Sequence, residues 1–110
     1  MVINMKSETP LVCNMDVFTT AQREQHIETA RRLFQTVQNI QEAENGFEFT
    51  LPSGSDLTKI SEFILNEKRC CPFLKFTLTI NPDPKPITLR LLGPQGTQEF
   101  LREEFSEAFA

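Results

Sequence analysis

Residues 57–80 read LTKISEFILNEKRCCPFLKFTLTI, and two consecutive patterns in this stretch decide the fold. In its first half, apolar residues recur every three or four positions, which predicts an amphipathic helix over residues 57–71 with Ser55 as its N-cap. Pro72 lacks an amide hydrogen and disfavours helical geometry in the residue before it, so the helix ends there. Over residues 74–80, apolar and polar side chains alternate, which predicts a strand with one buried face.

The same two patterns continue on both sides of this stretch. Helical spacing predicts a first helix from Thr20 to about Asn39, which a capping box of Thr19 and Gln22 would open. A last amphipathic helix follows the turn at residues 93–96 and carries Phe100, Phe105 and Phe109. Alternation predicts three further strands, over residues 11–17, 47–51 and 87–91.

These elements predict an α/β (α+β) fold, a two-layer sandwich in the order β-α-β-α-β-β-α. Each predicted strand has one apolar face, so the helices should cover one face of a four-stranded sheet. We expect a mixed sheet, because a strand-helix-strand unit usually joins parallel neighbours, whereas the last two strands form a hairpin. Residues 11–110 are long enough for a single domain, and residues 1–10 are expected to form an N-terminal tail.

Composition excludes several classes of function. The net charge of −4 over 110 residues disfavours nucleic acid as a partner, because phosphates would be repelled. Ten Phe without Trp or Tyr indicate core packing rather than a base-stacking or sugar-stacking surface. The sequence has no apolar run that could span a membrane and no signal peptide at its start, so a cytoplasmic location is expected. Three cysteines in such a compartment do not indicate a disulfide framework.

Two ionisable residues are predicted on apolar helix faces. At about 100° per residue, Glu67 falls in the middle of the apolar stripe of the helix over residues 57–71. A buried carboxylate is costly unless it is paired, and Arg90, Lys68 or a ligand could compensate it. His26, the single imidazole, falls on the apolar stripe of the first helix. It is either an ordinary histidine at the edge of the core or a ligand.

The three cysteines are the main candidates for chemistry. Cys71 should point into the core and Cys70 should lie at its margin, at the sheet edge where the predicted strand containing Cys13 begins. Three thiolates suit soft ions such as mercury or trivalent arsenic, and three thiolates with an imidazole suit tetrahedral zinc. Glu67 and His26 would then be further ligands or neighbours of this metal or redox site.

Little in the sequence supports an enzyme. The residues include no phosphate-binding glycine loop, no nucleophile elbow and no HExxH motif. The negative end of the helix dipole should raise the pKa of Cys70 and Cys71 and disfavour thiol catalysis. An enzyme that uses the carboxylate of Glu67 is an alternative, and it requires an open pocket beside that residue. A disulfide between the adjacent cysteines would be strained, which suits a redox switch better than a structural bridge.

Residues 67–73, EKRCCPF, together with Leu89-Arg90-Leu91 and Gly93-Pro94-Gln95-Gly96, carry a family resemblance. They resemble a small bacterial domain with an E-x-x-C-C-P-F signature, and the resemblance extends over about residues 11–101. Similar segments occur as stand-alone proteins and beside regulators of the mercury-resistance type. The resemblance implies a link to metals and implies no catalytic residue.

Two functions remain open at this point. In the first, a small cytoplasmic domain uses Cys13, Cys70 and Cys71 as a vicinal-thiol site for zinc, a softer metal, a metalloid or a redox signal. In the second, the cysteines are core residues, because free cysteine is among the most buried residue types. The domain is then a non-catalytic module that binds a protein or a small ligand, or forms a homo-oligomer through its open sheet face or last helix. The separation of the three sulfur atoms distinguishes the two.

Overall fold

The computed structural model describes residues 11–109, so the predicted tail, residues 1–10, lies outside the described residues. A 3₁₀ turn precedes the helices and strands along the chain. The elements are η2 (Met15–Val17), α1 (Thr20–Gln35), β1 (Asn39–Ala43), β2 (Gly46–Leu51), α2 (Leu57–Cys70), β3 (Lys75–Thr79), β4 (Ile87–Leu92), α3 (Thr97–Glu104) and α4 (Ser106–Phe109). Within residues 11–109, no helix has both the length and the apolar character needed to cross a bilayer.

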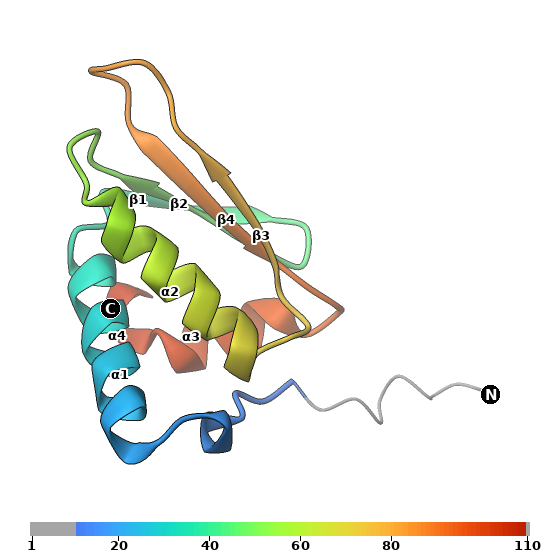
Figure 1. Ribbon diagram of the computed structural model, residues 1–110. Helices are drawn as coiled ribbons and strands as arrows, with labels where there is room; N and C mark the ends of the chain where they lie inside the picture. Colours follow the sequence, from blue (N-terminus) through green and yellow to red (C-terminus); the bar gives the residue numbers. More distant parts are fainter. Residues whose placement is uncertain (1–10, 110) are drawn as a thin grey trace.

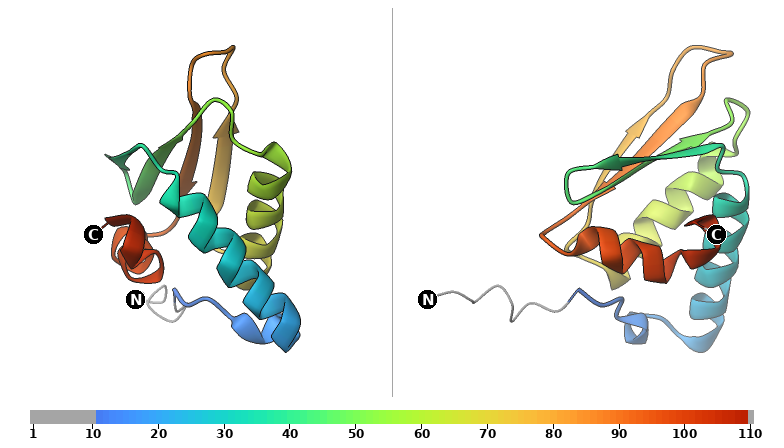
Figure 2. Two further views of the ribbon diagram at one scale, coloured as in Figure 1. Left: turned by 90° about the vertical axis from the view of Figure 1, so that its left-hand side faces the viewer. Right: turned by 180° about the vertical axis from the view of Figure 1, so that it is seen from behind.

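The four strands form one sheet in the order β1-β2-β4-β3, and every neighbouring pair is antiparallel. The helices cover one face of this sheet, and in the described part of the chain the other face carries no helix (Figures 1 and 2). This arrangement confirms the two-layer α+β class. The predicted mixed sheet is wrong. Residues 11–17, which were expected to pair in parallel with residues 47–51, are not part of the sheet, and the neighbour of β2 is instead β1, joined to it by a tight antiparallel hairpin.

The predicted strand over residues 11–17 is not a strand, so the predicted order β-α-β-α-β-β-α is also wrong. Residues 11–14 have no regular structure, and the chain then turns into η2, where Asn14 Oδ1 accepts a hydrogen bond from the amide of Asp16. Side chains from Leu11 to Val17 do alternate between half-buried and exposed. The alternation reflects one-sided burial of an extended segment against the helices, because no sheet edge lies beside it to pair with its backbone.

The helix predicted to reach Asn39 ends at Gln35, and the missing strand β1 begins where that helix was expected to end. Ile40 fits the helical stripe in sequence, but in the structure it lies opposite Phe49 of β2. Asn45 has a positive φ of 57° and closes the hairpin, with Gly46 beginning β2. The two loop residues are Glu44 and Asn45, and Gly46 already pairs with Ala43, so Asn45 with its positive φ is the turn signal that precedes β2.

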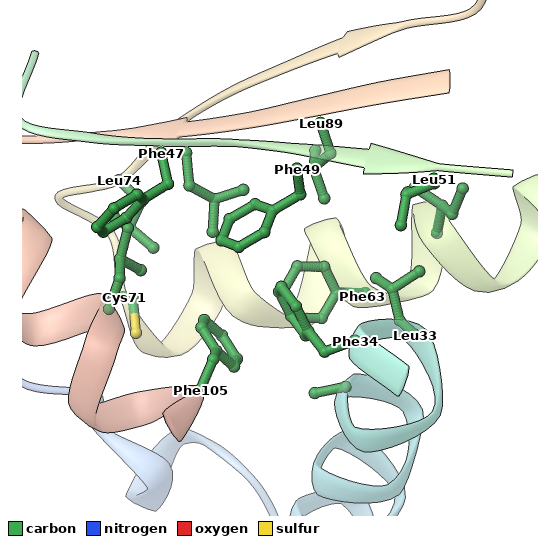
Figure 3. Packing of buried hydrophobic residues seen from close by; sticks show 14 of the residues in the cluster. Leu33, Phe34, Phe47, Phe49, Leu51, Phe63, Cys71, Leu74, Leu89 and Phe105 are labelled. Carbon is green, nitrogen blue, oxygen red and sulfur yellow. The ribbon is translucent and has the colours of Figure 1, made fainter. Parts of the chain in front are cut away.

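The core lies between the sheet and the helices and is rich in Phe (Figure 3). Phe34 of α1 is its centre, since its ring packs 5.0 Å from Phe49, 5.5 Å from Phe63 and 4.3 Å from Phe105 between ring centroids. The predicted last helix is interrupted at Phe105, whose non-helical backbone separates α3 from α4. This break lets Phe105 and Phe109 both reach the core, with Phe109 4.8 Å from Phe47.

Helix α2 is positioned by its two caps. Asp56, and not the predicted Ser55, caps its N-terminus by accepting from the amides of Thr58 and Lys59. At the other end, Cys70 is the last helical residue, and the amide of Cys71 donates to Glu67 O at 2.7 Å. Because Pro72 follows, the helix stops with both cysteines facing the interior.

Candidate metal centre

The structure brings the three thiols together. Cys13 Sγ lies 2.7 Å from Cys70 Sγ, and Cys70 Sγ lies 3.7 Å from Cys71 Sγ. A main-chain hydrogen bond of 2.8 Å from Asn14 N to Cys70 O holds the segment that carries Cys13 against the end of α2. The predicted convergence of the three thiols is therefore confirmed, although an irregular segment and not a strand delivers Cys13.

The two adjacent cysteines are both fully buried, so the prediction that Cys70 lies at the margin of the core is wrong. Glu67 is also buried, at 1% exposure, as its position on the apolar stripe predicted. Its Oε1 atom lies 3.9 Å from Cys70 Sγ. One ligand atom from each of Cys13, Glu67, Cys70 and Cys71 lies within 4.8 Å of the others, which is close enough for one metal ion to contact all four.

The compensating partner of Glu67 is His26, and not Arg90 or Lys68. His26 Nε2 lies 2.8 Å from Glu67 Oε1, whereas Arg90 pairs with Glu48 on a neighbouring strand and Lys68 is exposed. The imidazole is 4% exposed and lies between the rings of Phe18 and Phe63. His26 therefore lies beside the thiol cluster as the neighbour of its carboxylate.

Glu104, the last residue of α3, is a member of the site that the sequence interpretation missed. Its Oε2 atom lies 3.8 Å from Cys71 Sγ. Burial, followed by the negative charge of Glu67, raises the pKa of Glu104 to about 9. The residue lies three positions after Leu101 and four after Phe100, on the apolar face of α3, and this spacing is the signal that could have identified it.

The electrostatic environment favours a thiolate at Cys70. Hydrogen bonds from Cys13 and then Cys71 lower the pKa of Cys70, and His26 lowers it further. Hydrogen bonding to Cys70 raises the pKa of Cys13, and hydrogen bonding to Cys13 and then to Cys70 raises the pKa of Cys71. The expectation that the helix dipole raises the pKa of both adjacent cysteines is therefore wrong for Cys70, because close hydrogen-bond donors outweigh a partial charge spread over the helix terminus.

Burial lowers the pKa of His26, but hydrogen bonds with Cys70 and Glu67 and the charge of Glu67 outweigh burial and raise it to about 9. At neutral pH these shifts favour an imidazolium at His26 beside a thiolate at Cys70. This combination places one positive charge among groups that would otherwise repel one another.

Comparisons with models of protein families, with curated proteins and with solved structures gave no match. The resemblance to the E-x-x-C-C-P-F domain thus stays a prediction.

Proposed function

We propose that Cys13, Cys70 and Cys71 bind one soft metal or metalloid ion. The observation that carries this proposal is the grouping of three sulfurs and one carboxylate oxygen within 4.8 Å. Thiolates that share a tetrahedral ion through bonds of about 2.3 Å lie about 3.8 Å apart. The Cys70–Cys71 separation of 3.7 Å fits this value, and Cys13 has to move outward by about 1 Å. Its segment contains no helix or strand that the shift would break, and the hydrogen bond that holds the segment to Cys70 O comes from the next residue, Asn14.

The charge of the site favours a metalloid or mercury over zinc. Three thiolates neutralise trivalent arsenic and two neutralise a mercuric ion, whereas three thiolates around zinc leave a net negative charge. The carboxylate of Glu67 adds a further negative charge, which His26 offsets. Because a net charge is expensive to bury, a neutral thiolate complex fits this buried site better. The resemblance to domains found beside mercury-resistance-type regulators agrees with this choice.

Native mass spectrometry of the reduced protein with arsenite, mercuric ions and zinc offered in turn tests the proposal. We expect one arsenic or mercury atom per chain, and an arsenic adduct that has lost three thiol protons. The double variant Cys70→Ser/Cys71→Ser should lose the adduct. Zinc should bind more weakly than either, because its thiolate complex keeps a net charge.

A matched control separates a built site from general thiol reactivity. Ser61 is exposed on α2, so Cys71→Ser combined with Ser61→Cys keeps three thiols but moves one out of the cluster. We expect this variant to lose the three-thiol arsenic adduct. Equal binding by the control and the unmodified protein, or no adduct with the unmodified protein, would contradict the proposal and favour the alternative in which the cysteines only pack.

The pair Cys13 and Cys70 supports a second candidate, a redox role. The two sulfurs are 2.7 Å apart, and the thiolate character of Cys70 favours attack on a peroxide. In that reaction the peroxide bond breaks, Cys70 becomes a sulfenic acid and an alcohol leaves; Cys13 then displaces water and forms the disulfide. After limited peroxide treatment, peptide mapping should find Cys13 joined to Cys70. A link between Cys70 and Cys71 instead would count against this role.

A further inference from the structure

A cavity of about 290 Å³ lies beside the thiol cluster, between α1 and the corner where α3 meets α4. Each of the three sulfurs contacts one residue that lines this cavity. The contacts are Cys13 Sγ to Met15 Sδ at 3.5 Å, Cys70 Sγ to Glu67 Oε1 at 3.9 Å, and Cys71 Sγ to Glu104 Oε2 at 3.8 Å. The cluster and the cavity therefore share a wall that is one side chain thick.

Much of the remaining wall is apolar. Ala30 and Phe34 of α1 line one side, and Phe105 and Ala108 line another, with the rings of Phe34 and Phe105 stacked 4.3 Å apart. Figure 3 shows these two rings on the helix side of the core. An apolar cavity of about 150 Å³ can hold a benzene molecule, so this one has room for a ring-sized group. A bare ion would use none of this apolar surface.

Three polar atoms of the cavity residues lack partners. Within residues 11–109, His26 Nδ1, Glu67 Oε2 and Glu104 Oε1 are buried and have no hydrogen-bond partner. His26 and Glu67 are 4% and 1% exposed. Glu67 and Glu104 are also the residues that contact the sulfurs of Cys70 and Cys71, so this polar part of the wall lies at the thiol end of the cavity.

We infer that the ligand of the thiol site is a trivalent metalloid that carries one small apolar organic group, of the type R–As=O. The arsenic binds to the cluster thiols, and the group R extends past the side chains of Met15, Glu67 and Glu104, which form the shared wall, into the cavity between α1 and the α3–α4 corner. This inference rests on the proposed function and specifies the class of ligand.

The binding step is a condensation that needs no oxidant. Two thiols react with R–As=O, two As–S bonds form, and both bonds between arsenic and oxygen break. The oxygen leaves as water with two protons, which come from two thiols or, where the Cys70 thiolate reacts, from one thiol and the His26 imidazolium, and arsenic stays trivalent. An organic arsenical therefore uses two thiols, whereas arsenite uses all three.

Titration calorimetry with phenylarsine oxide and with arsenite tests the inference. Ala30→Leu and Ala108→Leu each reduce the cavity from a different helix. In both variants we expect the Kd for phenylarsine oxide to rise by about tenfold or more, as for a ligand that loses room in an apolar pocket, and the Kd for arsenite to stay within about twofold. Ala21→Leu makes the same change at an exposed position of α1 and should alter neither value.

A second measurement needs no substitution. Affinities of the unmodified protein for methyl-, phenyl- and biphenyl-arsine oxides are divided by those of dithiothreitol, which removes the intrinsic reactivity of each arsenical. The ratio should rise from methyl to phenyl and fall for biphenyl, which is too large for the cavity. A flat series, or equal losses of arsenite and phenylarsine oxide binding in the cavity variants, would overturn the inference. If arsenite still binds, the proposed function survives; if neither arsenical binds, both fail.

Discussion

His26 Nε2 lies 2.8 Å from Glu67 Oε1, and neither side chain is more than 4% exposed. The imidazole comes from α1 and the carboxylate from α2, so the pair joins the two helices at the level of the thiol cluster. The main-chain oxygen of Glu67 also accepts a hydrogen bond from the amide of Cys71. Glu67, which pairs with His26, therefore helps to fix the chain at the cysteines. The position of the thiols therefore depends on this buried pair.

Replacement of His26 should destabilise the protein strongly. In His26→Gln, Glu67 loses its positive partner in a buried position, and removal of one member of a buried ion pair typically costs about 3–5 kcal/mol. The double variant His26→Gln/Glu67→Gln has no unpaired charge and should recover much of this loss. Urea unfolding measures the stability of the single and the double variant. A single variant within about 0.5 kcal/mol of the unmodified protein, the range of ordinary surface changes, would show that the pair does not hold the helices together.

Stability should fall with rising pH because of His26. Its pKa rises from 6.5 to about 9 on folding, so the folded state holds the proton more tightly than the unfolded state does. The stabilisation is therefore complete below pH 6.5 and is lost as the pH rises through about 9. The imidazole signal of the single histidine should titrate near pH 9 in nuclear magnetic resonance spectra. In His26→Gln, this part of the pH dependence of unfolding should disappear; an imidazole that titrates below 7 would contradict the prediction.

Alanine substitutions at the two candidate N-caps of α2, Asp56 and Ser55, should differ in their effect on the free energy of unfolding. Asp56 accepts two amide hydrogen bonds, so Asp56→Ala should lower the free energy of unfolding by about 1 kcal/mol. The neighbouring Ser55 donates its hydroxyl to Pro52 O and does not cap the helix, which makes Ser55→Ala the matched control. In thermal and urea unfolding, the Asp56→Ala variant should be less stable than the Ser55→Ala variant. The reverse order would assign the cap to Ser55, as the sequence pattern first indicated.

Gly46 should tolerate no side chain. A Cβ atom at this position would overlap the main-chain oxygen of Leu91 on β4, so Gly46→Ala should destabilise the protein by about 1–3 kcal/mol through overpacking. Gly54 lies in the loop before α2, and a Cβ atom there would meet nothing within 4 Å. Gly54→Ala should therefore leave the unfolding midpoint almost unchanged. Equal effects of the two substitutions would argue against the close approach of β2 and β4.

Local patterns determined most of the helices and strands. The stripe that ends at Pro72 predicts α2, and alternation predicts β2, β3 and β4, because these segments bury one face along their whole length. The same reasoning failed for residues 11–17 and for β1. An alternating pattern records which side chains are buried, but it does not record whether a neighbouring strand is present to accept the backbone hydrogen bonds.

By itself, the sequence determined the class of fold, the burial of Glu67 and the position of Cys70 and Cys71 at the C-terminal end of α2, whereas the approach of Cys13 to them is a tertiary contact. Those features follow from spacing along a single element, where geometry is fixed within a few residues. Only the tertiary structure decided the antiparallel order of the sheet, the partner of Glu67, the membership of Glu104 and the cavity beside the thiols. These depend on contacts between residues far apart in the chain, and several polar groups could have compensated a buried carboxylate until packing placed His26 beside it.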